Sequence, residues 1–248
     1  MTTVADLKVK IFADGADRAR VEALCSEPWI RGFTTNPTLM RSAGVDEYAS
    51  FAHELLGLVP DRPISFEVIA DELGEIERQG RLIASWGENV YVKVPITTTR
   101  GEPTADVVRR LSASAIKVNV TALMTLDQVE DAASWLADGP GSFVSVFAGR
   151  IADSGRDPVP IMREALERLA PYPHEELIWA SPREVLNVVQ ADAIGCHVIT
   201  VTDEILKRLS NLGRALDEYS LDTVRMFYRD AQAAGYTLEH ETRDLLAG

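Results

Sequence analysis

The stretch VYVKVPITTTRGEPTADVVRRLSASAIKVNVTAL, residues 90–123, contains the unit from which the fold can be predicted. Val90–Pro95 and Lys117–Leu123 are short apolar runs of the kind that form buried strands. Between them, Ala105–Ser114 has the apolar spacing of an amphipathic helix. A strand, a helix and a second strand in this order predict that the two strands pair in parallel through a helical crossover.

The same alternation continues along the chain in both directions. Six further strand candidates are bounded by turn signals: Val9–Asp14, Gly32–Asn36, Ile64–Ile69, Phe143–Gly149, Leu177–Ser181 and Val198–Thr202. Segments with helical periodicity separate most of them: Ala16–Ser26, Glu47–Leu58, Glu72–Ser85, Leu126–Ala137, Pro160–Leu169 and Arg183–Ile194. Eight such units in 248 residues predict an α/β fold, a single-domain (β/α)8 TIM barrel over residues 1–248. An open doubly wound sheet is the alternative, and residues 221–248 are expected to form extra helix packed outside the barrel.

Composition narrows the classes of partner. The two cysteines, Cys25 and Cys196, lie far apart in the sequence, so a reducing cytoplasm is the expected location. No apolar run has the length of a membrane span, and the N-terminus lacks the pattern of a signal peptide. The net charge of −13 argues against nucleic acid as a partner. If the ligand is an anion, a few placed cations must therefore bind it.

The two faces of the predicted strands differ in character, because successive side chains of a strand point to opposite sides. One set is apolar and is expected beneath the helices: Val90, Val92, Val94, Val118, Val120, Val144, Val146, Ile178 and Ala180. The other set is mostly polar and is expected to point into the barrel: Asp14, Thr34, Asn36, Glu67, Lys93, Asn119, Thr121, Ser145, Phe147 and Ser181. Nearly all of the second set lie near the C-terminal ends of their strands, where barrel enzymes build their active sites.

Lys93 is the centre of this predicted site. It is one of only five lysines, and it lies among apolar neighbours in Val-Tyr-Val-Lys-Val-Pro. A buried amine loses its proton more readily than an exposed one, and a neutral amine can form a Schiff base with a ketone. The alternative is a buried ion pair between Lys93 and either Asp14 or Glu67.

Carboxylates near such an amine could move protons. Asp14 could take the hydroxyl proton that is lost when a carbon–carbon bond breaks, and Glu67 with Thr121 could hold a water that serves the imine. Asp14 precedes Gly15, so local turn chemistry is the alternative for this residue. Glu67 lies inside a strand candidate and needs a partner there.

Amides and cations complete the predicted site. Asn36 and Asn119 could bind the hydroxyls of a polyol, although Asn36 could equally cap the helix that starts at Pro37. Ser181 and Arg183, with backbone amides at the start of a helix, could bind a phosphate group. Arg150 could add a second cation, or it could instead form a salt bridge with Asp153.

Seven motifs in this chain resemble those of the transaldolase family. In order they are FAD (12–14), GFTTNPTL (32–39), SFEV (65–68), VKVPIT (92–97), NVT (119–121), SVFAGRI (145–151) and ASPR (180–183). They fall on seven of the eight predicted strands. The combination of TTNP and VKVP is specific, whereas either motif alone would be weak.

The resemblance implies a class I aldol mechanism that uses neither a metal ion nor an organic cofactor. Lys93 would form the Schiff base, and Asp14 would be the acid and base for the C3–C4 bond. Glu67 and Thr121 would position the catalytic water. The implied substrate-binding residues are Thr34, Asn36, Asn119, Ser145, Phe147, Arg150, Ser181 and Arg183. Of these, Asn36, Asn119 and Ser145 would orient a dihydroxyacetone unit, with Arg150, Ser181 and Arg183 around the phosphate.

The resemblance also separates related activities. Deoxyribose-phosphate aldolases carry their lysine on the sixth strand, where this chain reads FVSVFAG (143–149). Fructose 6-phosphate aldolases, which release free dihydroxyacetone, tend to have glutamine at the position of Glu67 and tyrosine at that of Phe147. A phenylalanine cannot help to protonate the bound fragment. The two residues therefore favour a transferase over a lyase, and a non-catalytic sugar-phosphate-binding barrel is a third alternative.

Two departures from the family leave the natural substrates open. Pro182 interrupts the serine–x–arginine motif, and the loop Thr97–Pro103 is longer than expected and could reshape the acceptor side. The substrate is expected to be a phosphorylated or otherwise anionic sugar, from the pentose phosphate pathway or from a specialised one. The family resemblance allows a monomer as well as a homo-oligomer, either a dimer or a larger ring.

Overall fold

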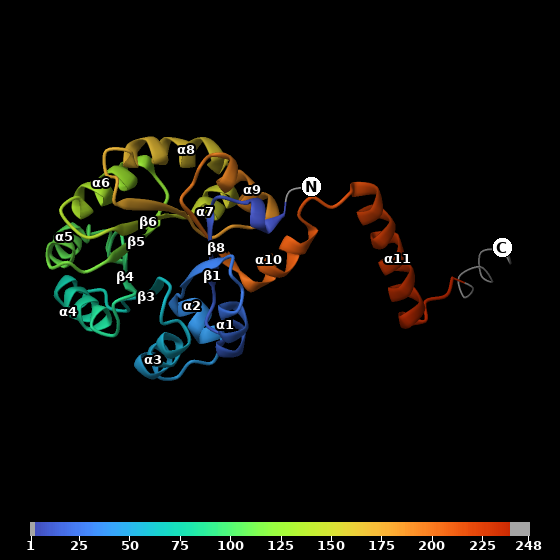
Figure 1. Ribbon diagram of the computed structural model, residues 1–248, viewed down its shortest axis with the longest axis horizontal. Helices are drawn as coiled ribbons and strands as arrows, with labels where there is room; N and C mark the ends of the chain where they lie inside the picture. The colour runs from blue at the N-terminus through green and yellow to red at the C-terminus, as the bar shows by residue number, and fades with distance from the viewer. Residues whose placement is uncertain (1–2, 239–248) are drawn as a thin grey trace, which may run out of the picture. The chain divides into compact units, whose positions relative to one another are not determined.

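The computed structural model describes residues 3–238. Eight parallel strands form a closed barrel in the order β1 to β8, with helices between consecutive strands along the chain (Figure 1). The strands are β1 (Lys10–Asp14), β2 (Ile30–Thr34), β3 (Ile64–Glu67), β4 (Val90–Pro95), β5 (Val118–Leu123), β6 (Ser142–Val146), β7 (Glu175–Trp179) and β8 (Val198–Thr202). The predicted (β/α)8 barrel is confirmed, and the open sheet is excluded because β1 pairs with β8.

The helices follow the strands in the expected alternation. They are α1 (Arg18–Cys25), α2 (Pro37–Ser42), α3 (Tyr48–Leu58), α4 (Leu73–Ala84), α5 (Ala105–Ala113), α6 (Leu126–Leu136), α7 (Ala148–Asp153), α8 (Pro158–Leu169), α9 (Val185–Ala193), α10 (Asp203–Arg208) and α11 (Leu216–Ala234). Two short 3-10 turns, η1 (Val4–Asp6) and η2 (Leu209–Asn211), complete the described elements.

Two helices replace predicted strand ends. The strands expected to reach Asn36 and Gly149 stop at Thr34 and Val146, and α2 and α7 begin shortly after them. At the first of these sites, the Asn36 side chain accepts a hydrogen bond from the amide of Leu39, and Pro37 occupies the first helical position. A capped helix start of this kind ends the strand locally.

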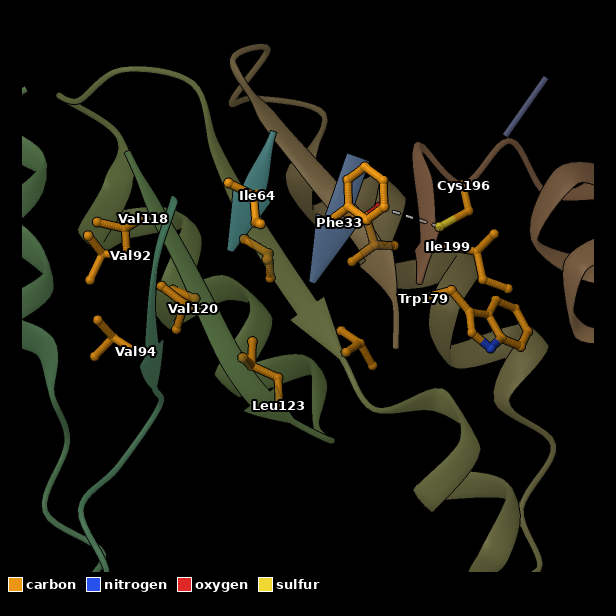
Figure 2. Close-up of a cluster of buried hydrophobic side chains, with 14 of the residues drawn as sticks. Phe33, Ile64, Val92, Val94, Val118, Val120, Leu123, Trp179, Cys196 and Ile199 are labelled. Carbon is orange, nitrogen blue, oxygen red and sulfur yellow. Dashed lines mark hydrogen bonds between the residues drawn. The ribbon is translucent and has the colours of Figure 1, made fainter. Parts of the chain in front are cut away.

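The main core lies between the strands and the surrounding helices. Figure 2 shows part of it, including Val92, Val120 and Trp179. The apolar faces predicted for the fourth, fifth and sixth strands are confirmed, since all seven of their valines are buried in this layer. Their burial stabilises the fold by roughly 25 cal/mol for each Å² of apolar surface removed from water.

The seventh strand has the opposite facing to the one predicted. Ile178 and Ala180 belong to the cluster inside the barrel, whereas Leu177 and Trp179 lie in the layer beneath the helices. The prediction was wrong because it extended the alternation to Ser181. That residue lies beyond the end of β7 and has a left-handed backbone, with φ of 59°. Past the end of a strand, the two-residue alternation no longer decides where a side chain points.

An apolar plug fills the interior of the barrel below the predicted site. The plug consists of Phe12, Tyr91, Phe143, Ile178 and Val198. The ring of Phe143 stacks on Tyr91 at 4.3 Å between centroids and meets the edge of Phe12 at 5.5 Å. Gly32 is required beside it, because a Cβ at this position would lie 2.6 Å from the Phe12 ring.

The chain divides into two compact units. One is the barrel, Val4–Ser210, and the other begins at Asn211 and contains α11. The extra C-terminal helix is confirmed, although it begins at Leu216 and none of its residues is buried. Its predicted packing outside the barrel stays a prediction, and residues 239–248 lie outside the described part. Among the described helices, none has the length and apolar character needed to cross a membrane.

Candidate active site

A cavity of about 550 Å³ is lined by residues from the C-terminal ends of the strands. All twelve predicted site residues line it: Asp14, Thr34, Asn36, Glu67, Lys93, Asn119, Thr121, Ser145, Phe147, Arg150, Ser181 and Arg183. A larger cavity of about 830 Å³, lined mainly by α1, α2 and α10, shares only Asp14, Leu39 and Thr202 with it and contains none of the other predicted residues. The smaller cavity is therefore the candidate site.

Lys93 lines this cavity and is held by two partners. Its side chain is 8 % exposed, and its Nζ lies 3.0 Å from Oε2 of Glu67. The amine also donates a hydrogen bond to the carbonyl of Thr35 at 3.3 Å. The register of β3 and β4 explains the ion pair, because it sets Glu67 directly beside Lys93. Of the two ion-pair partners considered from the sequence, Glu67 is the one that the structure provides.

Asp14 lies in the same electrostatic environment. The hydroxyl of Thr34 donates to its Oδ1 at 2.7 Å. Burial raises the pKa of Asp14, while the charge of Lys93 and the Thr34 hydrogen bond oppose the rise and the charge of Glu67 adds to it. A carboxyl group with a raised pKa in a cavity suits proton transfer near neutral pH. The contacts of Asp14 therefore extend beyond the local turn at Gly15 to other residues that line the cavity.

Asn119 is fixed by two hydroxyl groups. Its Nδ2 donates to Oγ of Ser65 at 3.1 Å, and Oγ of Ser145 donates to its Oδ1 at 2.7 Å. These bonds set the orientation of the amide without a contact to the backbone. Ser65 was not predicted as a site residue, although it has the same strand facing as Glu67 two residues later.

Thr121 is the one predicted site residue with a fully buried polar side-chain atom, its Oγ1, that lacks a hydrogen-bond partner among the described residues. The next residue, Ala122, has φ of 67°, and the pairing of β5 with β6 shifts register here. A buried hydroxyl without a partner is rare in proteins and fits a site that binds water or substrate.

The structure confirms one of the two roles considered for Asn36, the capping of the helix that starts at Pro37. Oδ1 of Asn36 caps α2 through the amide of Leu39 at 3.0 Å, as the capping hypothesis predicted. The side chain also lines the cavity. Because the cap occupies this oxygen, the Nδ2 group is the part best suited to a ligand.

Two arginines, Arg150 and Arg183, also line the cavity. Arg183 donates from Nη1 to Oγ of Ser181 at 3.0 Å and pairs with Asp153 through Nε, at 3.0 and 3.1 Å. The predicted alternative of an Arg150–Asp153 salt bridge is wrong, because Asp153 pairs with Arg183. Among the described residues Arg150 has no carboxylate partner within 4.0 Å, and its guanidinium lies 5.7 Å from the centre of the Phe147 ring.

The backbone near Arg183 differs from the predicted phosphate cradle. The amides of Arg183 and Glu184 both donate to Oδ1 of Asn187, and α9 begins only at Val185. These amides are therefore already occupied, and an anion would depend on the side chains. Gly149 lets α7 approach this turn, since a Cβ there would lie 1.6 Å from the carbonyl oxygen of Ser181.

Two more features depart from the expectations. Thr200 and Thr202 of β8 line the cavity, although no motif marked this strand. The loop Thr97–Pro103 contributes no lining residue; Thr99 binds Asp71 instead, and Arg100 pairs with Glu72. Within residues 3–238, no group of three or more His, Cys, Asp or Glu side chains is placed to hold a metal ion.

Comparisons with known proteins agree on one family. A family model described as "Transaldolase/Fructose-6-phosphate aldolase" matches residues 11–246. A "Probable transaldolase" of Herpetosiphon aurantiacus is 32 % identical over 202 residues, which cover 81 % of this chain and 87 % of that protein. Proteins of the same name from Dehalococcoides mccartyi and Methanococcus maripaludis are 30 % and 31 % identical, covering 81 % and 82 % of this chain and 90 % of each relative.

Solved structures agree on the barrel at low sequence identity. A dihydrodipicolinate synthase family protein from Coccidioides immitis superposes with a TM-score of 0.59 at 14 % identity, over 91 % of this chain and 77 % of that one. A mandelate oxidase superposes with a TM-score of 0.54 at 13 % identity, over 82 % of this chain and 71 % of that one. At these identities the likeness concerns the fold alone.

Proposed function

Because this chain belongs to the transaldolase/fructose-6-phosphate aldolase family, we propose that it is a transaldolase that acts through a Schiff base on Lys93. The donor is a ketose phosphate such as fructose 6-phosphate, and the unit transferred to an aldose acceptor is dihydroxyacetone. The observation that carries the proposal is the buried Lys93 amine, 3.0 Å from Glu67 in a cavity that also contains Asp14.

The first half of the reaction forms the imine and breaks the C3–C4 bond. Lys93 gives up a proton, and its neutral amine attacks the C2 carbonyl of the donor; loss of water then leaves an iminium ion. Asp14 removes the proton of the C4 hydroxyl, the C3–C4 bond breaks, and the aldehyde fragment leaves. The bonding electron pair moves into the iminium ion and gives an enamine on Lys93.

The second half reverses these steps with a new aldehyde. C3 of the enamine attacks the acceptor carbonyl, and Asp14 returns its proton to the new C4 oxygen. Water then hydrolyses the iminium ion, releases the product and restores the Lys93 amine. Glu67 beside the amine and the unused hydroxyl of Thr121 support a role for these two residues in binding that water.

The polar groups around the cavity support a sugar phosphate as the donor. Asn119, fixed by Ser65 and Ser145, presents an oriented amide to the hydroxyls of the dihydroxyacetone unit. Arg150, without a carboxylate partner among the described residues, and Arg183 beside Ser181 suit the phosphate. The pathway of such a substrate is the pentose phosphate pathway or a specialised one.

Two residues support transfer over release. Phe147 lines the cavity without a hydroxyl group, so it cannot protonate the enamine carbon and free the fragment. Glu67 keeps a carboxylate beside the amine. The second candidate is an aldolase that releases dihydroxyacetone, which would appear from the donor alone without an acceptor; a sugar-phosphate-binding barrel without catalysis is the third.

A cytoplasmic location and a homo-oligomer are also part of the proposal. The oligomer is supported by α11, where Leu216, Phe227 and Tyr228 are 82 %, 63 % and 67 % exposed. Large apolar side chains in such numbers on one helix usually mark an interaction surface.

Intact mass after borohydride reduction with fructose 6-phosphate tests the Schiff base. The wild type and Lys117→Ala should both gain the mass of one reduced dihydroxyacetone unit, whereas Lys93→Ala should gain none. Lys117 is a suitable control because its amine binds the carbonyl of Glu88, away from the cavity. If the wild type forms no adduct with any of a panel of ketose phosphates, the transaldolase proposal is wrong and the binding barrel is favoured.

A further inference from the structure

A chain of hydroxyl groups ends on the carboxylate of Asp14. Thr34 of β2 donates to Oδ1 of Asp14 at 2.7 Å, and the hydroxyls of Thr34 and Thr200 are hydrogen bonded to each other. Both threonines are buried, with 2 % and 6 % of their surface exposed. This chain of hydroxyl groups therefore links three neighbouring strands, β8, β1 and β2, in the wall of the cavity.

The register of the strands explains how the two threonines meet. Thr34 pairs with Asp14, whereas Thr200 pairs with Phe12 and so lies one layer deeper on the other side of β1. Thr200 is thus directed at Thr34 from below, next to the apolar plug. Two β-branched side chains with few rotamers can hold such a contact at low entropic cost.

The number of hydroxyl hydrogens decides which residue donates in each hydrogen bond of this chain of hydroxyl groups. The Thr34 hydroxyl has a single hydrogen, and the Asp14 carboxylate takes it as the stronger acceptor. In the contact between the two threonines, Thr200 must therefore be the donor. Without Thr200, the Thr34 hydroxyl would keep only its bond to Asp14, since no third hydrogen bond of that hydroxyl is found among the described residues.

We propose that Thr200 is a positioning residue for the reaction, which holds the Thr34 hydroxyl on Asp14 and thereby keeps the carboxylate ready to accept the C4 hydroxyl proton. This role rests on the proposed function, because it assigns Asp14 the proton transfer of the aldol step.

The charges around Asp14 do not depend on Thr200. Lys93 of β4 and Glu67 of β3 are the charged groups that act on this carboxylate, and the flanking strands β2 and β8 present threonines to it. Replacing Thr200 by valine keeps the shape and removes one hydroxyl. The pKa of Asp14 should then rise further, because a hydrogen bond to the ionised form is weakened.

Kinetics of three variants test the proposal. Thr200→Val should lower kcat roughly three- to tenfold with little change in KM, and should move the acidic limb of the pH profile to higher pH. Thr200→Ser should restore both values. Thr104→Val is the matched control: it also removes a buried hydroxyl, which binds the carbonyl of Pro95, and it should keep the wild-type pH profile.

A titration independent of turnover separates this proposal from the proposed function. The carboxyl carbon of Asp14, labelled with 13C and assigned with Asp14→Asn, should titrate at higher pH in Thr200→Val than in the wild type or Thr200→Ser. An unchanged midpoint together with an unchanged pH profile would overturn the role of Thr200. An inactive wild type would refute the transaldolase proposal, while a shifted Asp14 midpoint would still support the hydroxyl chain. Thermal unfolding of each variant shows whether a loss of activity is a loss of fold.

Discussion

The two halves of the barrel interior use the same strands but opposite kinds of side chain. Towards the N-terminal ends of the strands lies the apolar plug, where aromatic rings contact one another directly. Towards the C-terminal ends lies the cavity, with a buried ion pair, a carboxyl group of raised pKa and a hydroxyl without a partner. The plug has the groups expected of a stable core, whereas the cavity keeps groups that a stable core would avoid.

This difference indicates that the plug stabilises the fold, whereas the cavity provides the proposed active site. Substitutions in the plug should change the free energy of unfolding and leave the chemistry of the remaining molecules intact. Substitutions in the cavity should change the chemistry and have a smaller effect on the free energy of unfolding. The following variants test that separation, from the largest expected effect to the smallest.

Lys93→Met should have the largest effect on activity. It removes the nucleophile but keeps a side chain of similar length, so kcat for transfer should fall by roughly a thousandfold or more. Glu67 loses its partner in this variant, so stability is best compared in Lys93→Met combined with Glu67→Gln, which removes the ion pair as a whole. The free energy of unfolding of that double variant should change much less than kcat, because a buried ion pair adds little net stability. Steady-state kinetics and urea unfolding measure the two quantities. A large loss of stability with residual activity would contradict this separation between a stabilising plug and a reactive cavity.

Phe143→Ala should have the largest effect on stability. It removes a ring that stacks on Tyr91 and meets Phe12, and the cavity left behind should cost about 3–5 kcal/mol in unfolding free energy. Leu186→Ala, at a side chain that is 52 % exposed, is the control and should stay within about 0.5 kcal/mol of the wild type. Urea unfolding gives both numbers, and equal losses would show that the plug is no special source of stability.

Glu175→Gln should stabilise the protein in a pH-dependent way. Glu175 is buried at the start of β7, its Oε2 has no partner among the described residues, and burial raises its pKa to about 8. The unfolded chain loses this proton near pH 4.5, so from there up to about pH 8 the folded state holds more protons and stability falls as pH rises. Near pH 8 the glutamine variant should exceed the wild type by about 1–3 kcal/mol, and near pH 4 the difference should vanish.

Thermal or urea unfolding across pH 4 to 9 measures this effect. Glu176→Gln is a neighbouring control, because Glu176 has Lys10 as a partner at 2.5 Å. This control should retain the decline in stability between acidic and neutral pH. A wild-type curve without such a decline would mean that Glu175 is not a buried acid.

Tyr48→Phe should have the smallest effect. The Tyr48 hydroxyl donates to the backbone carbonyl of Glu67 at 2.7 Å, from outside the barrel. Its loss should cost about 0.5–1.5 kcal/mol and lower kcat a few-fold, because the strand end that carries Glu67 becomes less fixed. Tyr91→Phe makes the same chemical change in the plug and should leave kcat unchanged. A similar kcat for both variants and the wild type would remove any role of Tyr48 in the site.

Much of the cavity could be predicted from the sequence because it depends on strand ends. Lys93 and Asn119 lie in strands whose apolar and polar faces alternate cleanly, and both point inward as expected. All twelve predicted residues line one cavity, although their roles stay predictions. Thr200 was missed, since its neighbours in Val198–Thr202 alternate between apolar residues and threonines that strands also use for packing.

Other errors came from places where the chain leaves a strand. The facing of Ile178 and Ala180 was wrong because Ser181 had already turned into a left-handed conformation. The backbone amides near Arg183 were expected to be free, but Asn187, four residues later, occupies them. Local alternation contains no information about such turns or about which carboxylate an arginine reaches.

The sequence by itself determined the barrel, the inward set of polar residues and the family, because strand alternation and short motifs are local properties of the chain. Only the tertiary structure decided the pairing of Lys93 with Glu67, of Arg183 with Asp153, and of Thr200 with Thr34. Each of these contacts joins residues from different elements. The register of neighbouring strands and the path of the turns bring such residues together. Neither of these can be predicted from the local pattern of apolar and polar residues.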